Sequence, residues 1–164
     1  MSIDNVKKRL VGKGILHSEE SIQGRPTVIG YAKRFRWTWF ATQLNTFIVA
    51  TDFGDDTVRV QAIEDVLSEA FQYAKKNYRG WPRGFQSGLG VIGILLSSSI
   101  DAEAASYCTA LKSGKKWAGF SVPVAVDTTS NETFVFQRNP MWGRIYYPYF
   151  KTMVEDLTEQ RASK

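Results

Sequence analysis

Residues 89–99 form the most apolar run of the chain, and this run limits the fold more than any other stretch. A strand buried on only one face alternates apolar and polar side chains, whereas residues 89–96 show no polar alternation and are followed by three serines. We therefore predict a strand buried on both faces, as are the inner strands of a parallel or mixed sheet. The rest of the chain is expected to pack around it.

Length and cysteine content set outer limits on the class of protein. A chain of 164 residues with 43% hydrophobic residues predicts a single globular domain over residues 1–164, which buries about two-thirds of its unfolded surface. The only cysteine, Cys108, excludes an internal disulfide, and the charged N-terminal stretch does not resemble a secretory signal. No apolar run approaches the roughly 20 residues of a membrane span, so we expect a soluble, cytoplasmic protein.

Hydrophobic periodicity predicts an α+β (mixed α/β) fold. Helical spacing of apolar residues marks a first helix capped by Ser2, a long helix from Asp56 or Thr57 to 77, a helix over 101–113 and a last helix opened by Pro148. Strand patterns mark residues 27–40, 45–51, 89–96, 117–126 and 133–137, and the polar residues 17–26 indicate a loop. We expect a central mixed sheet of about five to six strands with parallel core strands, flanked by about four helices.

The stretch 27–40 combines rings with cations. Phe35, Trp37 and Trp39 share one parity, and Arg34 and Arg36 share the other. One interpretation places the rings in the core and the cations in water. The other is a platform for single-stranded nucleic acid, in which cations contact the backbone and rings stack under the bases. Its predicted residues are Lys33, Arg34, Arg36, Lys75, Lys76 and Arg79.

The segment 78–88 is the most unusual connection, with three glycines, a proline, two arginines and three rings. Phosphate-binding loops run from a strand through glycines into a helix, whereas this segment runs from a helix into a strand. We therefore predict an ordered loop whose Trp81 and Phe85 pack into the core. If a site lies on a loop, this one is favoured, with Trp81, Arg83, Phe85 and Gln86 as its residues.

Acidic residues follow the predicted parallel strands. Asp52, Asp55, Asp56 and Asp127 would meet at the carboxyl edge of the sheet, where open sheets bind ligands. Carboxylates at that edge suit Mg²⁺ and a metal-assisted phosphate-transfer or hydrolysis site. The simpler interpretation is that they cap turns and helices.

The order of helix, three strands, helix and strand is similar to the restriction-endonuclease-like core. That resemblance implies a metal site with an acidic residue, one spacer and a lysine on the third strand. Residues 47–53 supply Asp52 but no lysine, so a nuclease of this type would be degenerate.

Three functions remain compatible with these patterns. A non-catalytic module that self-associates or binds a protein partner accounts for an aromatic content of 13% without a catalytic constellation. Its alternatives are a nucleic-acid-binding protein and an Mg²⁺-dependent enzyme. No cofactor other than Mg²⁺ is suggested. The lone His17 has no partner for a metal site in the sequence around it, and Cys108 is expected in the core.

Overall fold

The computed structural model describes residues 1–82, 86–111, 119–138 and 144–158. Its helices are α1 (Ile3–Gly12), the short 3-10 helix η1 (Trp37–Trp39), α2 (Val60–Asn77), α3 (Ala102–Ala110) and α4 (Tyr147–Thr158). Its strands are β1 (Leu16–Ile22), β2 (Arg25–Arg36), β3 (Thr42–Gly54), β4 (Ser87–Ser97), β5 (Gly119–Asp127) and β6 (Thr133–Phe134). The strands form one sheet in the order of the sequence, in which β3, β4 and β5 are parallel and β2 and β6 are antiparallel to their neighbours. The fold is therefore α+β with a mixed sheet, as predicted.

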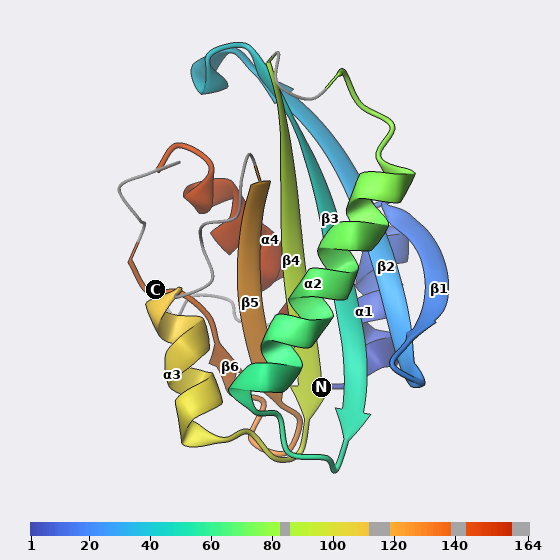
Figure 1. Cartoon of the computed structure of the whole chain (residues 1–164), viewed down its shortest axis with the longest axis vertical. Helices are drawn as coiled ribbons and strands as arrows, with labels where there is room; N and C mark the ends of the chain where they lie inside the picture. Colours follow the sequence, from blue (N-terminus) through green and yellow to red (C-terminus); the bar gives the residue numbers. More distant parts are fainter. Residues whose placement is uncertain (83–85, 112–118, 139–143, 159–164) are drawn as a thin grey trace.

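Strand β4 lies at the centre of the sheet and is buried on both faces (Figure 1). It pairs in parallel with β3 on one side and β5 on the other, so that Ile92 lies opposite Ile48 and Val122. The prediction for the apolar run is confirmed. A strand with apolar side chains on both faces needs a covering layer on each face, which the helices supply.

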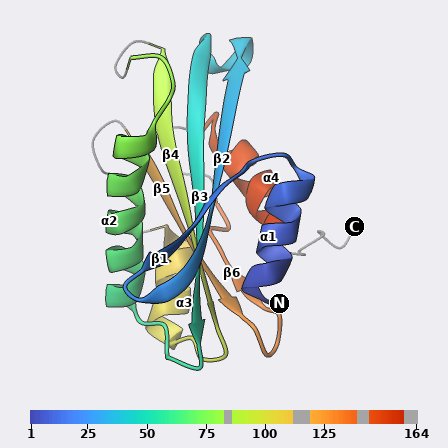
Figure 2. The same ribbon diagram turned by 90° about the vertical axis from the view of Figure 1, so that its right-hand side faces the viewer.

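Helices α2 and α3 cover one face of the sheet, and α1 and α4 cover the other (Figure 2). We call these the α2 face and the α4 face. Side chains alternate between them along each strand, so that Phe47 belongs to the core under α2 and Ile48 to the core under α4. The same alternation decides where the polar residues of β2 and β3 point.

The predicted helices are present, with shifted boundaries. Ser2 caps α1 by accepting a hydrogen bond from the Asn5 N–H, and the apolar stripe of α2 is buried as expected. Neither predicted cap, Asp56 or Thr57, precedes α2 directly. The helix begins at Val60, because Val58 forms a β-bridge with Ile100. Helix α3 ends at Ala110 rather than 113, and residues 112–118 lie outside the described part of the chain.

The loop predicted at 17–26 is wrong, since these residues form β1, a turn and the start of β2. Strand β1 is an edge strand that pairs only with β2, so most of its side chains are exposed and only Ile22 is buried. Its sequence lacks the apolar alternation of a half-buried strand for that reason. Gln23 and Gly24 both have positive φ, which fits the tight turn of a two-residue hairpin.

The last strands differ slightly from the prediction. Strand β6 spans two residues instead of the predicted 133–137, and it pairs only with Ala125 and Val126 of β5. Pro123 therefore lies where β5 has no neighbour on its outer side, the position that a proline tolerates in a sheet. Pro148 occupies the first turn of α4 as predicted. None of the described helices is long and apolar enough to cross a membrane.

Cys108 is a core residue, as its place on α3 predicts. Its side chain is fully buried, and burial raises the pKa of the thiol to about 12, against a smaller lowering by a hydrogen bond from the backbone at Ala125. The thiolate is the form that reacts. The folded protein therefore holds Cys108 in its unreactive form.

We predict that Cys108 reacts with a thiol reagent at about pH 8 at least a thousandfold more slowly in the folded protein than in denaturant, since the thiolate fraction falls about tenfold per pKa unit. The measurement is the rate of labelling followed by mass spectrometry. Equal rates in the two states would contradict the assigned burial.

The same shift predicts a loss of stability at alkaline pH. The unfolded thiol, with a pKa of about 8.5, releases its proton before the folded one does, so the free energy of unfolding falls as pH rises from about 8.5 towards 12. Urea unfolding across this range should show a steeper fall for the natural chain than for Cys108→Ala. Parallel curves would show that another group controls the loss.

Candidate nucleic-acid interface

Exposed rings gather at one end of the molecule. Among the described residues, six large apolar side chains are exposed, and four of them form a group that we call the aromatic tip: Phe35, Trp37, Phe40 and Trp81. Trp37 and Phe40 are 79% and 81% exposed. The Phe35 ring centroid lies 5.2 Å from that of Trp37 and 5.8 Å from that of Trp81. The tip lies at the end of the molecule where the segment that follows α2 reaches the β2–β3 hairpin with η1 (Figure 1).

The interpretation that Phe35, Trp37 and Trp39 point into the core is wrong for Phe35 and Trp37 and correct for Trp39. Residues 37–39 leave the strand and form η1, so strand parity no longer decides their direction. Trp39 is 2% exposed, and its indole N–H donates to the Ile145 carbonyl at 3.1 Å. Its ring makes edge contacts with Tyr146 and Tyr149. Trp39 therefore fixes the hairpin end to the segment leading into α4.

The turn after η1 has a strained backbone. Phe40 and Ala41 have φ angles of 53° and 55°, in the left-handed region that non-glycine residues rarely adopt. Each such residue costs of order 1 kcal/mol. The turn presents Phe40 to solvent in spite of that cost, and the buried Trp39 stabilises it.

The other side of the tip is held by buried amides on the α2 face. Gln43 and Asn45 point from β3 towards the segment 78–81, and both are buried. The Trp81 backbone N–H donates to Gln43 Oε1 at 3.1 Å, and Asn45 accepts a 2.6 Å hydrogen bond from the Tyr31 hydroxyl. Buried amides need such partners. The bond to Gln43 fixes the loop on the sheet, and the Tyr31 hydroxyl satisfies Asn45 within the sheet. Trp81 is thereby placed beside Phe35.

Gly80 lets the chain approach these amides. A Cβ at this position would lie 2.6 Å from Asn45 Nδ2 and 2.7 Å from the Tyr78 hydroxyl. Tyr78 is not free to move, since its hydroxyl hydrogen-bonds the Trp81 carbonyl and the Ser87 hydroxyl. Burial raises the pKa of Tyr31, with a smaller lowering by a backbone hydrogen bond from Arg79, so its phenol stays protonated as a donor at neutral pH.

The structure brings the predicted cations to the same end of the molecule and divides them between its two faces. Lys33 points to the α2 face, where its ammonium donates to the Arg79 carbonyl at 2.8 Å. Arg34 and Arg36 point to the α4 face. Lys75 and Lys76 lie in the last turn of α2, where cations also complement the helix C-terminus, and Lys75 lies over the Phe71 ring.

No acidic residue occurs in the stretches that build this end. Residues 21–51, 70–100 and 133–154 contain neither Asp nor Glu, while each contains at least three Lys or Arg. Our sequence interpretation counted cations and missed this absence. It is the signal that predicts a positive potential over the tip, because the cations there are not neutralised by neighbouring carboxylates.

The predicted acidic residues lie at the opposite end, where β3, β4 and β5 finish (Figure 1). Asp52 accepts from the Gly54 N–H, Asp55 accepts from the Ser98 hydroxyl, and Asp56 pairs with Arg25 at 2.7 Å. Asp127 accepts from the N–H groups of Thr129 and Ser130, which lower the pKa of its carboxyl. Within the described residues, no three His, Cys, Asp or Glu side chains are grouped to hold a metal ion. Each carboxylate has a local structural partner.

The remaining predicted site residues are only partly placed. Trp81 is 44% exposed, so the expectation that it packs into the core is wrong. Gln86 is exposed and its carbonyl accepts from the Gln43 N–H at 2.8 Å. Arg83 and Phe85 lie outside the described residues. His17 is exposed on β1, with its ring edge-on to those of Tyr31 and Tyr73.

Comparison of the chain with protein-family models, with curated proteins and with solved structures finds no match. The third strand, β3, has no lysine, so it lacks the pair of residues that the resemblance to restriction-endonuclease-like proteins would require. At the tip end it has the amides of Gln43, which binds the loop at Trp81, and of Asn45, which binds Tyr31. Function must therefore be argued from the geometry of this chain.

We predict that Gly80→Ala lowers the free energy of unfolding by about 1–3 kcal/mol, because the added methyl group overpacks the buried amide cluster. Gly12→Ala is the matched control, since a Cβ at Gly12 meets nothing within 4 Å. Urea unfolding of both variants measures the difference. Equal stability of the two would show that the 78–81 segment is not held against Asn45.

Proposed function

We propose that the protein is a non-catalytic module that binds single-stranded nucleic acid at the aromatic tip. The observation that carries the proposal is the combination of exposed rings, three of them in contact through Phe35, with cations on both faces and no carboxylate in the surrounding stretches. Such a surface stacks bases on its rings and pairs phosphates with its cations. The contacts do not depend on base identity, so we expect weak sequence preference.

The exposed rings favour a single strand over a duplex. Trp37 and Phe40 lie in and directly after η1 at the hairpin end, and most of each side chain is exposed. Bases inside a duplex are already stacked, whereas those of a single strand are free to stack on protein side chains. The anchoring of the tip by Trp39 and by the buried amides reduces the entropy lost on binding.

Self-association through the same end is less favoured by the charges. Two copies meeting at their aromatic tips would bring Arg34, Arg36 and Arg79 close to their own counterparts. Like charges at an interface oppose association. A protein partner with an acidic surface would meet the same cations, and the binding assay below tests nucleic acid directly.

The carboxylates at the acidic end take no part in the proposed binding. Its carboxylates serve turns, a strand end and an ion pair with Arg25. We therefore expect binding of the strand without Mg²⁺ and no cleavage of it.

We predict that a short single-stranded oligonucleotide binds the natural chain and that Trp37→Ala weakens binding about tenfold, since one stacked ring contributes about 1–3 kcal/mol. Trp37→Phe should retain most of the affinity because it keeps a ring. Fluorescence anisotropy at several salt concentrations without Mg²⁺ measures both.

The charge contribution is tested in the same assay. Arg79→Gln should reduce the slope of log affinity against log salt by about 0.7, the value for one phosphate contact on a single strand. Arg59→Gln removes the same charge at the acidic end, where Arg59 is exposed, and should leave the slope unchanged. No binding to the natural chain at low salt, or equal loss in the two arginine variants, would refute the proposal; a dimer by sedimentation would then favour self-association.

A further inference from the structure

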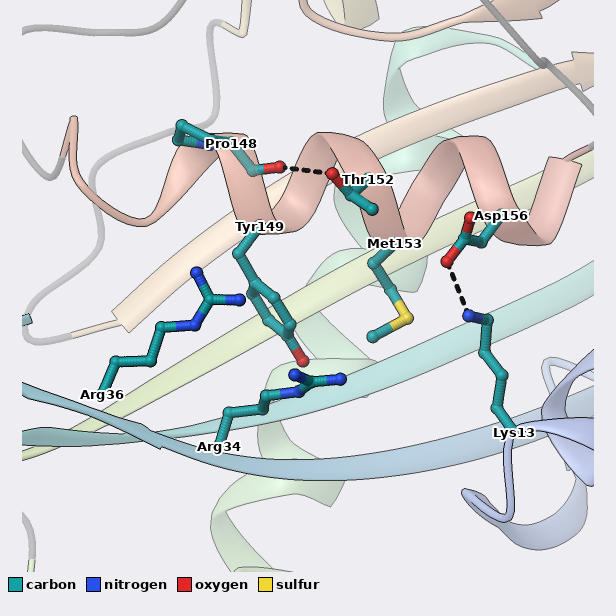
Figure 3. A pocket seen from close by; sticks show the side chains of 8 residues that line it. All are labelled: Lys13, Arg34, Arg36, Pro148, Tyr149, Thr152, Met153 and Asp156. Carbon is teal, nitrogen blue, oxygen red and sulfur yellow. Dashed lines mark hydrogen bonds and ion pairs between the residues drawn. The ribbon is translucent and has the colours of Figure 1, made fainter. Parts of the chain in front are cut away.

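A pocket of about 290 Å³ lies on the α4 face, between β2 and α4 (Figure 3). Arg34 and Arg36 line it from β2, and Tyr149 lines it from α4. Lys13 and Asp156 line its far end, where the Lys13 ammonium lies 2.6 Å from Asp156 Oδ2. Its volume is at the lower limit of small-molecule pockets, about 300 Å³, so it suits one small group rather than a whole nucleobase and sugar.

The pocket has an excess of positive charge. Asp156 is the one carboxylate among its lining residues, and Lys13 neutralises it. Arg34 and Arg36 have no carboxylate partner among the residues that the structure describes. A guanidinium group presents two parallel N–H donors that match two oxygens of a phosphate. Two such groups on one strand, two residues apart, form a site for an anion with several oxygens.

Each guanidinium group lies near an aromatic ring. The Arg34 Cζ lies 5.9 Å from the centroid of the Tyr149 ring, and the Arg36 Cζ lies 4.9 Å from that of Trp39. A ring at such a distance attracts the cation without using its N–H donors. The N–H donors of both arginines therefore stay available to an anion.

Tyr149 adds an unsatisfied donor. Its hydroxyl is buried, and neither it nor the neighbouring Thr46 hydroxyl meets the geometry of a hydrogen bond. Burial raises the pKa of Tyr149, opposed by smaller effects of Thr46 and of the Arg34 and Arg36 charges, so the phenol is protonated at neutral pH. In Figure 3 this hydroxyl points towards Arg34. An acceptor oxygen placed between the two would give it a partner.

We infer that this pocket binds the terminal phosphate monoester of the bound strand; the inference rests on the proposed function. A terminal phosphate has more charge and one more free oxygen than an internal phosphodiester. Two guanidinium groups can neutralise that charge and donate hydrogen bonds to the additional oxygen. The pocket is suited to an end because the Lys13–Asp156 ion pair lies at the side away from Arg36 (Figure 3), the last residue of β2 before the aromatic tip. A strand stacked on the tip would place its last phosphate between Arg34 and Arg36.

The test compares three oligonucleotides of one sequence, with a phosphate at the 5′ end, at the 3′ end or at neither. We expect one phosphorylated form to bind the natural chain about tenfold more tightly than the unphosphorylated form, as an added charged hydrogen-bonded contact would give. The ratio of the two affinities should fall to about one in the double variant Arg34→Gln, Arg36→Gln. It should persist in Lys151→Gln, which removes a charge from an exposed part of α4 that does not line the pocket.

Each outcome decides a separate statement. Because the ratio cancels any general loss of affinity, a preference that survives the double variant overturns the pocket and leaves the proposed function standing. Equal affinity for all three oligonucleotides also overturns the pocket and leaves the proposed function standing. Failure of all three to bind overturns both proposals. A free-ion site is distinguished by inorganic phosphate, which would raise the melting temperature of the natural chain without any preference among the oligonucleotides, and that result overturns recognition of a strand end.

Discussion

The burial of β4 on both faces is the constraint on which the rest of the structure depends. Its apolar side chains have to be covered by helices on each side of the sheet, and it pairs in parallel with both neighbours. Parallel pairing sends the carboxyl ends of β3, β4 and β5 to one end of the molecule and their amino ends to the other. The crossover helix α2 then returns its C-terminus to the amino end, where the rings and cations gather.

The second constraint is the cost of burying amides in that sheet. Gln43 and Asn45 occupy positions on β3 that further along the strand hold Phe47 and Val49. A buried amide without partners would destabilise the fold, so the 78–81 segment and Tyr31 are required as its partners. The same hydrogen bonds place Trp81 at the aromatic tip, which makes the shape of the exposed surface dependent on polar groups inside the protein.

Sequence periodicity predicted the fold class, the central strand, the long helix α2 and the burial of Cys108, because each depends on a regular apolar pattern. It failed for β1, an edge strand whose exposed polar side chains carry no such pattern. It also failed for Trp37 and Trp81, since strand parity ends where η1 begins and since Gln43, a partner distant in sequence, positions Trp81. The sequence named the cations of the predicted nucleic-acid site, but only the fold shows that Arg34 and Arg36 face α4 while Lys33 faces α2.

The separation of charge between the two ends has a consequence before any contact forms. With cations at the aromatic tip and carboxylates where the parallel strands end, the molecule has an electric dipole along its strands. The field of a polyanion exerts a torque on this dipole that turns the tip forward at separations up to about 8 Å, the screening length at physiological salt. The carboxylates at the far end, which take no part in binding, would thus still contribute to the rate and orientation of encounter.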